Sequence, residues 1–282
     1  MIKIVESPRE GMQGVDNFIP TSAKIRFINQ LLKVGFDTVE LGSIVNPRVV
    51  PQMADAMDLI GQLDFTNSNS ERMVLVMSRR GAEMVAPKVE VTTLSYPFSF
   101  TTSFLEKNVR ATVDQVYGTT AEVLNLSDKY GKKAVIYISY AYGNPYGDAW
   151  NLDLLLEWIG KLRTIGAQII PLSNVSLEID AELINQVFTA IMQEYPDLEF
   201  GLHLHHGKGD WAAKVDAAYQ AGCRRFDTVM NGFGGCPMSG HELMGNLATQ
   251  DLVRFLHEKQ IVNPLEPTLL NDSIKIANEI YR

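Results

Sequence analysis

The sequence predicts one α/β domain in which eight parallel strands close into a barrel surrounded by helices. Short β-rich runs alternate with longer amphipathic helical patterns along the whole chain, with no linker or low-complexity tract between them. Eight strand–helix units can be counted, and 282 residues is close to the roughly 250 of a typical (β/α)8 barrel. The first strand lacks the G-x-G-x-x-G turn that would favour an open doubly wound sheet. We therefore expect a single TIM barrel over residues 1–282.

The predicted strands are continuously apolar or β-branched. They cover residues 2–6, 37–41, 73–77, 89–95, 134–140, 167–173, 198–205 and 224–230. Runs of this kind are typical of strands buried on both faces, as in a parallel sheet covered by helices.

Helical patterns fill the intervals between these strands. The clearest cover residues 20–35, 152–166, 181–195, 210–222 and 246–259. In the first, Thr21 or Ser22 can cap the N-terminus and Gly35 can end the last turn. A short helical segment, from about residue 265 to 282, is expected after the last barrel unit.

Composition limits the possible partners and compartments. A formal net charge of -8 and a pI near 5.2 argue against nucleic acid or an anionic membrane as a general partner. Cys223 and Cys236 are too few for a disulfide framework, and neither a signal peptide nor an apolar run of roughly 18 residues is present. The sequence therefore predicts a cytoplasmic protein with reduced thiols.

Chemically competent side chains follow the predicted strands. In a parallel barrel the carboxyl ends of the strands meet on one rim, which is where active sites form. The residues expected on this rim are Arg9, Glu10 and Gln13 after strand one, Glu40 and Ser43 at strand two, Asn174 after strand six, His203 and His205 in strand seven, and Gly234, Gly235 and Cys236 after strand eight.

The histidines of "GLHLHH" carry the strongest single signal. Because strand side chains alternate, His203 and His205 share one face, while Leu202 and Leu204 take the other. Both imidazoles then project into the barrel mouth with the spacing of a metal site completed by an oxygen ligand. Two hydrogen-bonded histidines without a metal are the alternative. His206 is one step out of phase and should face away.

Two further side chains have candidate chemical roles. Cys236 lies in the glycine-rich "GFGGCPMSG", where a reduced thiol can donate or accept a proton, although the glycines could also form a plain turn. Arg9 at the barrel mouth can stabilise negative charge on an oxygen, or it can form a structural salt bridge with Glu40. Cys223 is interpreted as packing.

Six sequence motifs together match the order and spacing of a known family. They are "PREGMQG", "VELGSIVNPRVVPQM", "GNPYGD", "HLH", "GFGGCP" and "GNLATQDLV". From about residue 4 to residue 262, the chain resembles the 3-hydroxy-3-methylglutaryl-CoA lyases of the metal-dependent carbon-carbon lyase and Claisen synthase superfamily. The resemblance implies cleavage of that acyl-CoA to acetyl-CoA and acetoacetate on Mg²⁺ or Mn²⁺, by a homodimer.

The resemblance also implies roles for individual residues. It makes Glu10, His203, His205 and Asn246 the metal ligands, and Arg9, Glu40 and Cys236 the catalytic residues. We expect the substrate to contact Gln13, Ser43, Asn174, Gly234 and Gly235.

The chain departs from the family pattern at the site. Glu10 and Asn174 stand where the family usually has aspartates, "HGKG" follows the histidines, and the stretch from Cys236 to Asn246 is one residue longer. A longer carboxylate can bind a hard cation only if its backbone shifts.

Three alternative functions remain open. A related lyase or Claisen-type synthase could act on another acyl-CoA or keto acid, although the related synthases carry C-terminal regions beyond the barrel. A catalytically inactive barrel could serve binding or regulation. A hydrolase is the weakest alternative, since the His-x-His pair of amidohydrolase-like barrels belongs to the first strand.

Overall fold

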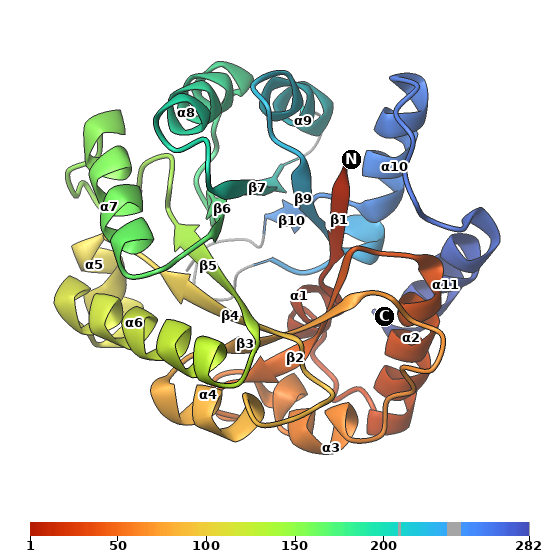
Figure 1. The fold of residues 1–282 in the computed structure, drawn as a ribbon. Coiled ribbons are helices and arrows are strands. Elements are labelled where there is room, and N and C mark those ends of the chain that lie inside the picture. The colour runs from red at the N-terminus through yellow and green to blue at the C-terminus, as the bar shows by residue number, and fades with distance from the viewer. Residues whose placement is uncertain (208–209, 236–243, 282) are drawn as a thin grey trace.

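The computed structural model describes residues 1–207, 210–235 and 244–281. Eight parallel strands close into a barrel, which helices surround, and this confirms the predicted (β/α)8 fold (Figure 1). In barrel order the strands are β1 (Lys3–Glu6), β2 (Thr38–Ile44), β3 (Glu71–Val76), β4 (Thr93–Phe98), β5 (Lys133–Ser139), β6 (Ile169–Ser173), β7 (Glu199–His203) and β9 (Arg225–Thr228).

Several predicted strand boundaries differ from those of the structure, and the largest differences are at the start of β4 and the end of β7. β4 begins at Thr93 rather than at residue 89, because residues 89–92 form the connection before the register with β3 starts at Met73 and Thr93. The predicted strand 198–205 is divided at Leu204. β7 ends at His203, while β8 (His205–His206) pairs antiparallel with β10 (Gly245–Asn246).

The long helices surround the barrel, whereas the short α1 lies inside this ring, next to β1 and β2 (Figure 1). In chain order the helices are α1 (Pro8–Gln13), α2 (Thr21–Val34), α3 (Ala56–Ile60), α4 (Arg79–Val85), α5 (Thr102–Phe104), α6 (Val113–Lys129), α7 (Leu152–Thr164), α8 (Ala181–Glu194), α9 (Trp211–Gln220), α10 (Thr249–Glu258) and α11 (Pro267–Ile280), with shorter turns η1 (Pro51–Met53), η2 (Leu105–Val109) and η3 (Met230–Gly232). Among the described residues, no helix has the length and apolar character needed to cross a bilayer.

For α2, the predicted C-terminal end is confirmed and the predicted N-terminal cap is wrong. Gly35 ends the helix in the left-handed conformation, with φ 100°. The predicted side-chain cap is absent, because Pro20 is the N-cap residue and the Thr21 hydroxyl instead donates a hydrogen bond to Asp55.

The barrel core has two parts. A small interior cluster of Val5, Met73, Val135 and Tyr137 fills the barrel, while a much larger cluster packs the strands against the helices. The space at the carboxyl ends of the strands is left for polar side chains.

Two remote segments hold the short helix α1 in place. Tyr281 is buried, and its hydroxyl donates a 3.2 Å hydrogen bond to the Pro8 carbonyl. Its ring occupies the space beside Gly11, where an added Cβ would lie 2.4 Å from Tyr281 Cζ. From the other side Gly234, with φ 83°, lies so close that a Cβ there would be 1.9 Å from the Glu10 carbonyl oxygen. A side chain at Gly234 would displace the helix backbone, and one at Gly11 would displace the Tyr281 ring from its place beside the helix.

Candidate active site and metal centre

Three buried side chains from opposite ends of the chain meet at the barrel mouth. Glu10 comes from α1, His203 ends β7 and His205 begins β8. One candidate ligand atom from each lies within 4.8 Å of the other two. The structure therefore brings the Glu10 carboxylate beside both imidazoles, as expected from the sequence. The extra methylene of Glu10 does not prevent this approach.

The two imidazoles face one another, as the alternation predicts. His203 Nε2 lies 3.1 Å from His205 Nε2, while Leu202 and Leu204 are buried in the apolar core. On its other side His203 Nδ1 donates a 3.0 Å hydrogen bond to the Asp227 carboxylate. With the Nδ1 proton held there, the His203 Nε2 lone pair is directed at the centre of the cluster.

The residues fit a divalent cation. Glu10 Oε2 is buried and has no hydrogen-bond partner among the described residues. The two imidazole nitrogens can share one proton at 3.1 Å, so the Glu10 oxygen is the atom left without a partner, and a cation bound between the three residues would satisfy it. The donor set of one carboxylate and two imidazoles is compatible with Mg²⁺ or Mn²⁺ but does not distinguish between them.

Protonation of two of the three residues favours the same conclusion, whereas the pKa of His203 is raised, because Asp227 and Glu10 outweigh the effect of its burial. Burial raises the pKa of Glu10, but the charges of Arg9, His203 and His205 together lower it to about 2. Burial and the neighbouring His203 lower the pKa of His205 to about 3. Glu10 is therefore ionised and His205 neutral at neutral pH, which are the forms that bind metal.

Asn246 lies next to this cluster. It pairs with His205 across the two-residue ladder of β8 and β10, and its amide nitrogen donates a 2.7 Å hydrogen bond to the Phe233 carbonyl. That bond fixes the orientation of the amide, whose oxygen is the atom a hard cation would take.

Arg9 is buried in a set of oxygen acceptors. Its Nε and Nη2 donate to the two Glu40 oxygens at 2.9 and 3.1 Å, Nη2 also donates to Glu10 at 2.8 Å, and Nη1 donates to Gln13 at 3.0 Å. Burial lowers the pKa of Arg9, but the charges and hydrogen bonds of Glu40 and Glu10 together raise it above its ordinary value. The guanidinium is therefore a fixed positive charge beside the candidate metal centre.

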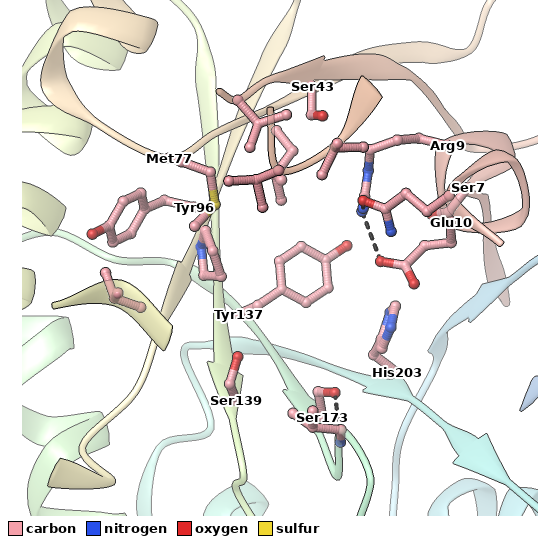
Figure 2. Close-up of a pocket in the computed structure, with 18 of the residues that line it drawn as sticks. Ser7, Arg9, Glu10, Ser43, Met77, Tyr96, Tyr137, Ser139, Ser173 and His203 are labelled. Atoms are coloured by element: carbon pink, nitrogen blue, oxygen red, sulfur yellow. Dashed lines mark hydrogen bonds and ion pairs between the residues drawn. The ribbon is translucent and has the colours of Figure 1, made fainter. Parts of the chain in front are cut away.

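These groups open onto one cavity (Figure 2). Ser7, Arg9, Glu10 and His203 lie at one end, and the Tyr137 ring stands in the middle with its hydroxyl directed toward Arg9 and Glu10. Ser43 Oγ is buried, lines the cavity and has no hydrogen-bond partner among the described residues. It is free to bond a ligand.

The other expected substrate contacts are placed differently. Gln13 lines the cavity, but Asn174, Gly234 and Gly235 are not among the described residues that do. Asn174 is fully buried, and its amide accepts from the His205 backbone nitrogen at 2.9 Å and donates to the His205 carbonyl at 2.7 Å. It thus holds the irregular backbone at Leu204, which does not suit the expected substrate contact. Cys236 lies outside the described residues.

Sequence reasoning missed Asp227 and Tyr137. Both are buried, Asp227 in contact with His203 and Tyr137 with its ring edge-on to the same imidazole at 5.5 Å. Alternation along "RRFDTVM" and "AVIYISY" places both side chains on inward faces. That signal could have identified them.

Comparison with known proteins agrees with this geometry. A family model described as HMGL-like matches residues 2–276. The chain belongs to the HMGL-like family. This confirms the resemblance stated from the sequence motifs.

Individual HMGL-like relatives span most of the chain. It is 32% identical over 260 residues to the hydroxymethylglutaryl-CoA lyase, mitochondrial, of Mus musculus, covering 91% of this chain and 78% of the relative. It is 29% identical to the 3-hydroxy-3-methylglutaryl-CoA lyase, cytoplasmic, of Rattus norvegicus, covering 91% and 74%. The solved HMG-CoA lyase of Bacillus subtilis superposes with a TM-score of 0.91 at 26% identity, covering 99% and 93%. Because these relatives include mitochondrial and cytoplasmic proteins, membership of the family does not fix the compartment.

Proposed function

We propose that this protein cleaves 3-hydroxy-3-methylglutaryl-CoA to acetyl-CoA and acetoacetate. The observation that carries the proposal is the buried cluster of Glu10, His203 and His205 beside the Arg9–Glu40 pair, in a cavity of an HMGL-like chain. Relatives at about 30% identity over nine-tenths of the chain are lyases of this acyl-CoA by name.

Glu10, His203, His205 and Asn246 would hold the divalent cation, Mg²⁺ or Mn²⁺. When bound, the ion supplies Lewis acidity toward the tertiary hydroxyl of the substrate and a neighbouring oxygen, which makes the hydroxyl proton easier to remove.

The chain's own residues provide the rest of the chemistry. Arg9, fixed by Glu40 and Gln13, stabilises negative charge that develops on the thioester oxygen as the carbon-carbon bond breaks. Ser43 Oγ, which lines the same cavity and has no partner among the described residues, donates a hydrogen bond to a substrate oxygen. Cys236 moves a proton to the carbon that becomes the acetyl methyl group, a role that rests on the family resemblance alone.

The test is direct. Protein loaded with Mg²⁺ or Mn²⁺ is incubated with 3-hydroxy-3-methylglutaryl-CoA, and acetyl-CoA and acetoacetate are measured. His205→Ala is expected to lose bound metal and turnover, whereas Cys236→Ala should keep metal and lose turnover. The exposed His257 in α10 provides the control His257→Ala, which should retain both. Absence of both products from the loaded wild-type protein would exclude this function.

One observation favours an inactive barrel as the second candidate. Asn174 stands where the family usually has an aspartate, and its amide bonds the His205 backbone and the Leu177 carbonyl, so it supplies no acid or base. A barrel of this kind would bind the acyl-CoA without forming products. Equilibrium binding of the acyl-CoA with no turnover would support it.

The remaining expectations stay predictions. We propose a homodimer in the cytoplasm, with an acyl-CoA as small-molecule partner and neither nucleic acid nor a membrane as partner. Sedimentation of the purified protein tests the dimer.

A further inference from the structure

A buried arginine lies inside the barrel, close to the candidate metal centre. Arg225 precedes Asp227 by two residues in β9, so the two side chains share the inward face of the strand. On the neighbouring strand β7, Gly201 is the partner of Arg225. Two positions further on, His203 is the partner of Asp227. Arg225 is therefore one layer of side chains away from a candidate metal ligand.

Gly201 leaves the space that the arginine side chain occupies. A Cβ at Gly201 would lie 3.0 Å from Arg225 Cδ and 3.1 Å from Arg225 Cγ, so a larger residue would press on the arginine stem. A glycine in the interior of a strand weakens the strand and often marks the close approach of another group. Here the group that approaches is the stem of Arg225.

The charge of Arg225 has few partners. Its Nη1 donates a 3.3 Å hydrogen bond to Glu199, whose side chain is 28% exposed. Among the described residues, its Nε and Nη2 have no hydrogen-bond partner, and neither has Asp227 Oδ1. Nε lies 4.0 Å from that oxygen. At this distance the two groups attract each other as charges without a hydrogen bond between them.

The two oxygens of Asp227 have different neighbours. Oδ2 accepts the 3.0 Å hydrogen bond from His203 Nδ1, whereas Oδ1 lies beside Arg225. The Asp227 side chain is 1% exposed, so water does not compensate its charge. Burial of a carboxylate is costly unless an opposite charge lies next to it. Arg225 supplies that charge at the oxygen that His203 does not use.

We propose that Arg225 is a positioning residue of the candidate metal centre. Its charge holds Asp227 in the orientation in which the carboxylate bonds His203, and it thereby supports the affinity for Mg²⁺ or Mn²⁺. The inference rests on the metal centre of the proposed function. Arg225 is not among the described residues that line the cavity, so it acts through Asp227 rather than by contact with the cation or the substrate.

Replacements of Arg225 provide the measurement. Arg225→Met keeps the buried stem without its charge, and Arg225→Gln is a second neutral variant. Each is expected to weaken Mn²⁺ binding about tenfold in competition with a metal-binding dye, at the lower end of the effect of groups that orient metal ligands. Arg225→Lys retains the charge and should bind Mn²⁺ as the wild type does, because no hydrogen bond to Asp227 has to be replaced.

Two control variants separate this role from a general effect on folding. Arg224→Met changes the adjacent arginine, which is exposed and donates to the Tyr219 carbonyl, and should leave the Mn²⁺ affinity unchanged. Glu199→Gln removes the hydrogen-bonded carboxylate of Arg225 without changing Asp227. It should lower the unfolding free energy in urea but leave the Mn²⁺ affinity as in the wild type.

A double variant tests whether the effect passes through Asp227. When Asp227→Asn is already present, adding Arg225→Met should change the Mn²⁺ affinity by no more than about twofold, which is the usual error of such cycles. A tenfold loss in both backgrounds would mean that Arg225 acts elsewhere, and would overturn the inference. Arg225→Lys and the double variant keep the buried charges balanced. If the neutral single variants do not fold, a tenfold loss in either of these two still overturns the inference.

Failure of the inference is distinguishable from failure of the lyase function. A wild-type protein that binds neither Mg²⁺ nor Mn²⁺ overturns the metal centre and the inference together. Unchanged affinity in folded Arg225→Met and Arg225→Gln overturns the role of Arg225 alone and leaves the lyase intact. Tighter binding in these variants would show that the arginine repels the cation, which also overturns the inference.

Discussion

At the scale of single residues, the orientation of the candidate metal ligands is set by their neighbours. Asp227 fixes the ring of His203 through Nδ1, and Asn174 fixes the backbone of His205 on both its nitrogen and its carbonyl. Neither neighbour needs to touch the cation. Carboxylates in this position keep the imidazole in one tautomer and increase its basicity.

Asp227→Asn is therefore expected to weaken metal binding by about 10- to 100-fold. The amide carries no charge, and its NH2 group can stabilise the tautomer whose Nε2 is protonated. Competition with a metal-binding dye gives the affinity. Asp153→Asn changes an exposed aspartate in the first turn of α7 and should have no effect. Equal affinities for both variants would show that Asp227 does not position His203.

Glu6 makes folding stability depend on pH. It is fully buried in β1, and burial raises its pKa to about 7 although Thr249, Met230 and Thr228 donate hydrogen bonds to it. The folded protein therefore holds this proton at pH values where the unfolded chain, with its ordinary pKa near 4.5, has lost it. Stability from this group is full below about pH 4.5 and falls as the pH rises toward 7.

Glu6→Gln should flatten this dependence, because the amide does not titrate. The wild type is expected to lose roughly 2 to 3 kcal/mol more than the variant between pH 5 and pH 8, from about 1.4 kcal/mol per pKa unit. Urea unfolding at both pH values measures the difference. Glu258→Gln in α10 alters an exposed carboxylate and should behave as wild type. A slope unchanged by Glu6→Gln would mean that Glu6 is ionised throughout.

Site residues were predictable from the sequence where two of them alternate along a single strand. His203 and His205 follow from alternation alone. Asn174 was expected to face a substrate, because the sequence does not reveal that the backbone bends after His203 and needs a partner for its polar groups.

At the scale of secondary-structure elements, the eight strands follow from apolar runs and the clearest helices from hydrophobic period, whereas the small elements follow from neither. α1 has six residues, too few for a helical period to appear, and it contains Gly11. The ladder of β8 and β10 pairs only two residues from each segment, about forty positions apart. Such elements exist because of long-range contacts, which no local pattern encodes.

The contact of Gly234 with α1 gives a matched pair of substitutions. Gly234 and Gly131 both have positive φ, 83° and 61°, but an added Cβ meets the Glu10 carbonyl at Gly234 and nothing within 4 Å at Gly131. Gly131→Ala is expected to cost about 1–2 kcal/mol of unfolding free energy from backbone strain alone. Gly234→Ala should cost more and also weaken metal binding, since it moves α1 and with it Glu10.

Unfolding curves and metal titrations of the two variants test this. If Gly234→Ala destabilises no more than Gly131→Ala and binds metal normally, the loop after η3 does not position α1.

At the scale of the whole molecule, the candidate metal centre brings together residues from the N-terminal and C-terminal parts of the chain. Glu10 belongs to the first βα unit, His203 ends the seventh strand, His205 follows it, and Asn246 precedes α10. A cation bound to all of them stabilises only the folded state, because the unfolded chain separates the ligands.

Saturating Mg²⁺ or Mn²⁺ should therefore raise the unfolding free energy, by about 2.7 kcal/mol at 100 times the Kd. Thermal unfolding at increasing metal concentration measures this effect. The rise in Tm should disappear in His205→Ala and persist in His257→Ala. A Tm that does not respond to metal in the wild type would contradict the site.

The Tyr281 ring, which fills the space beside Gly11, has a consequence for biosynthesis. α1 emerges from the ribosome early, but the neighbour that fixes it is residue 281. Translation must therefore reach this tyrosine before Arg9 and Glu10 acquire their final support. Arg9 and Glu10 are therefore synthesised early but fixed in position late. A nascent chain stalled before residue 281 would lack a properly formed cation pocket.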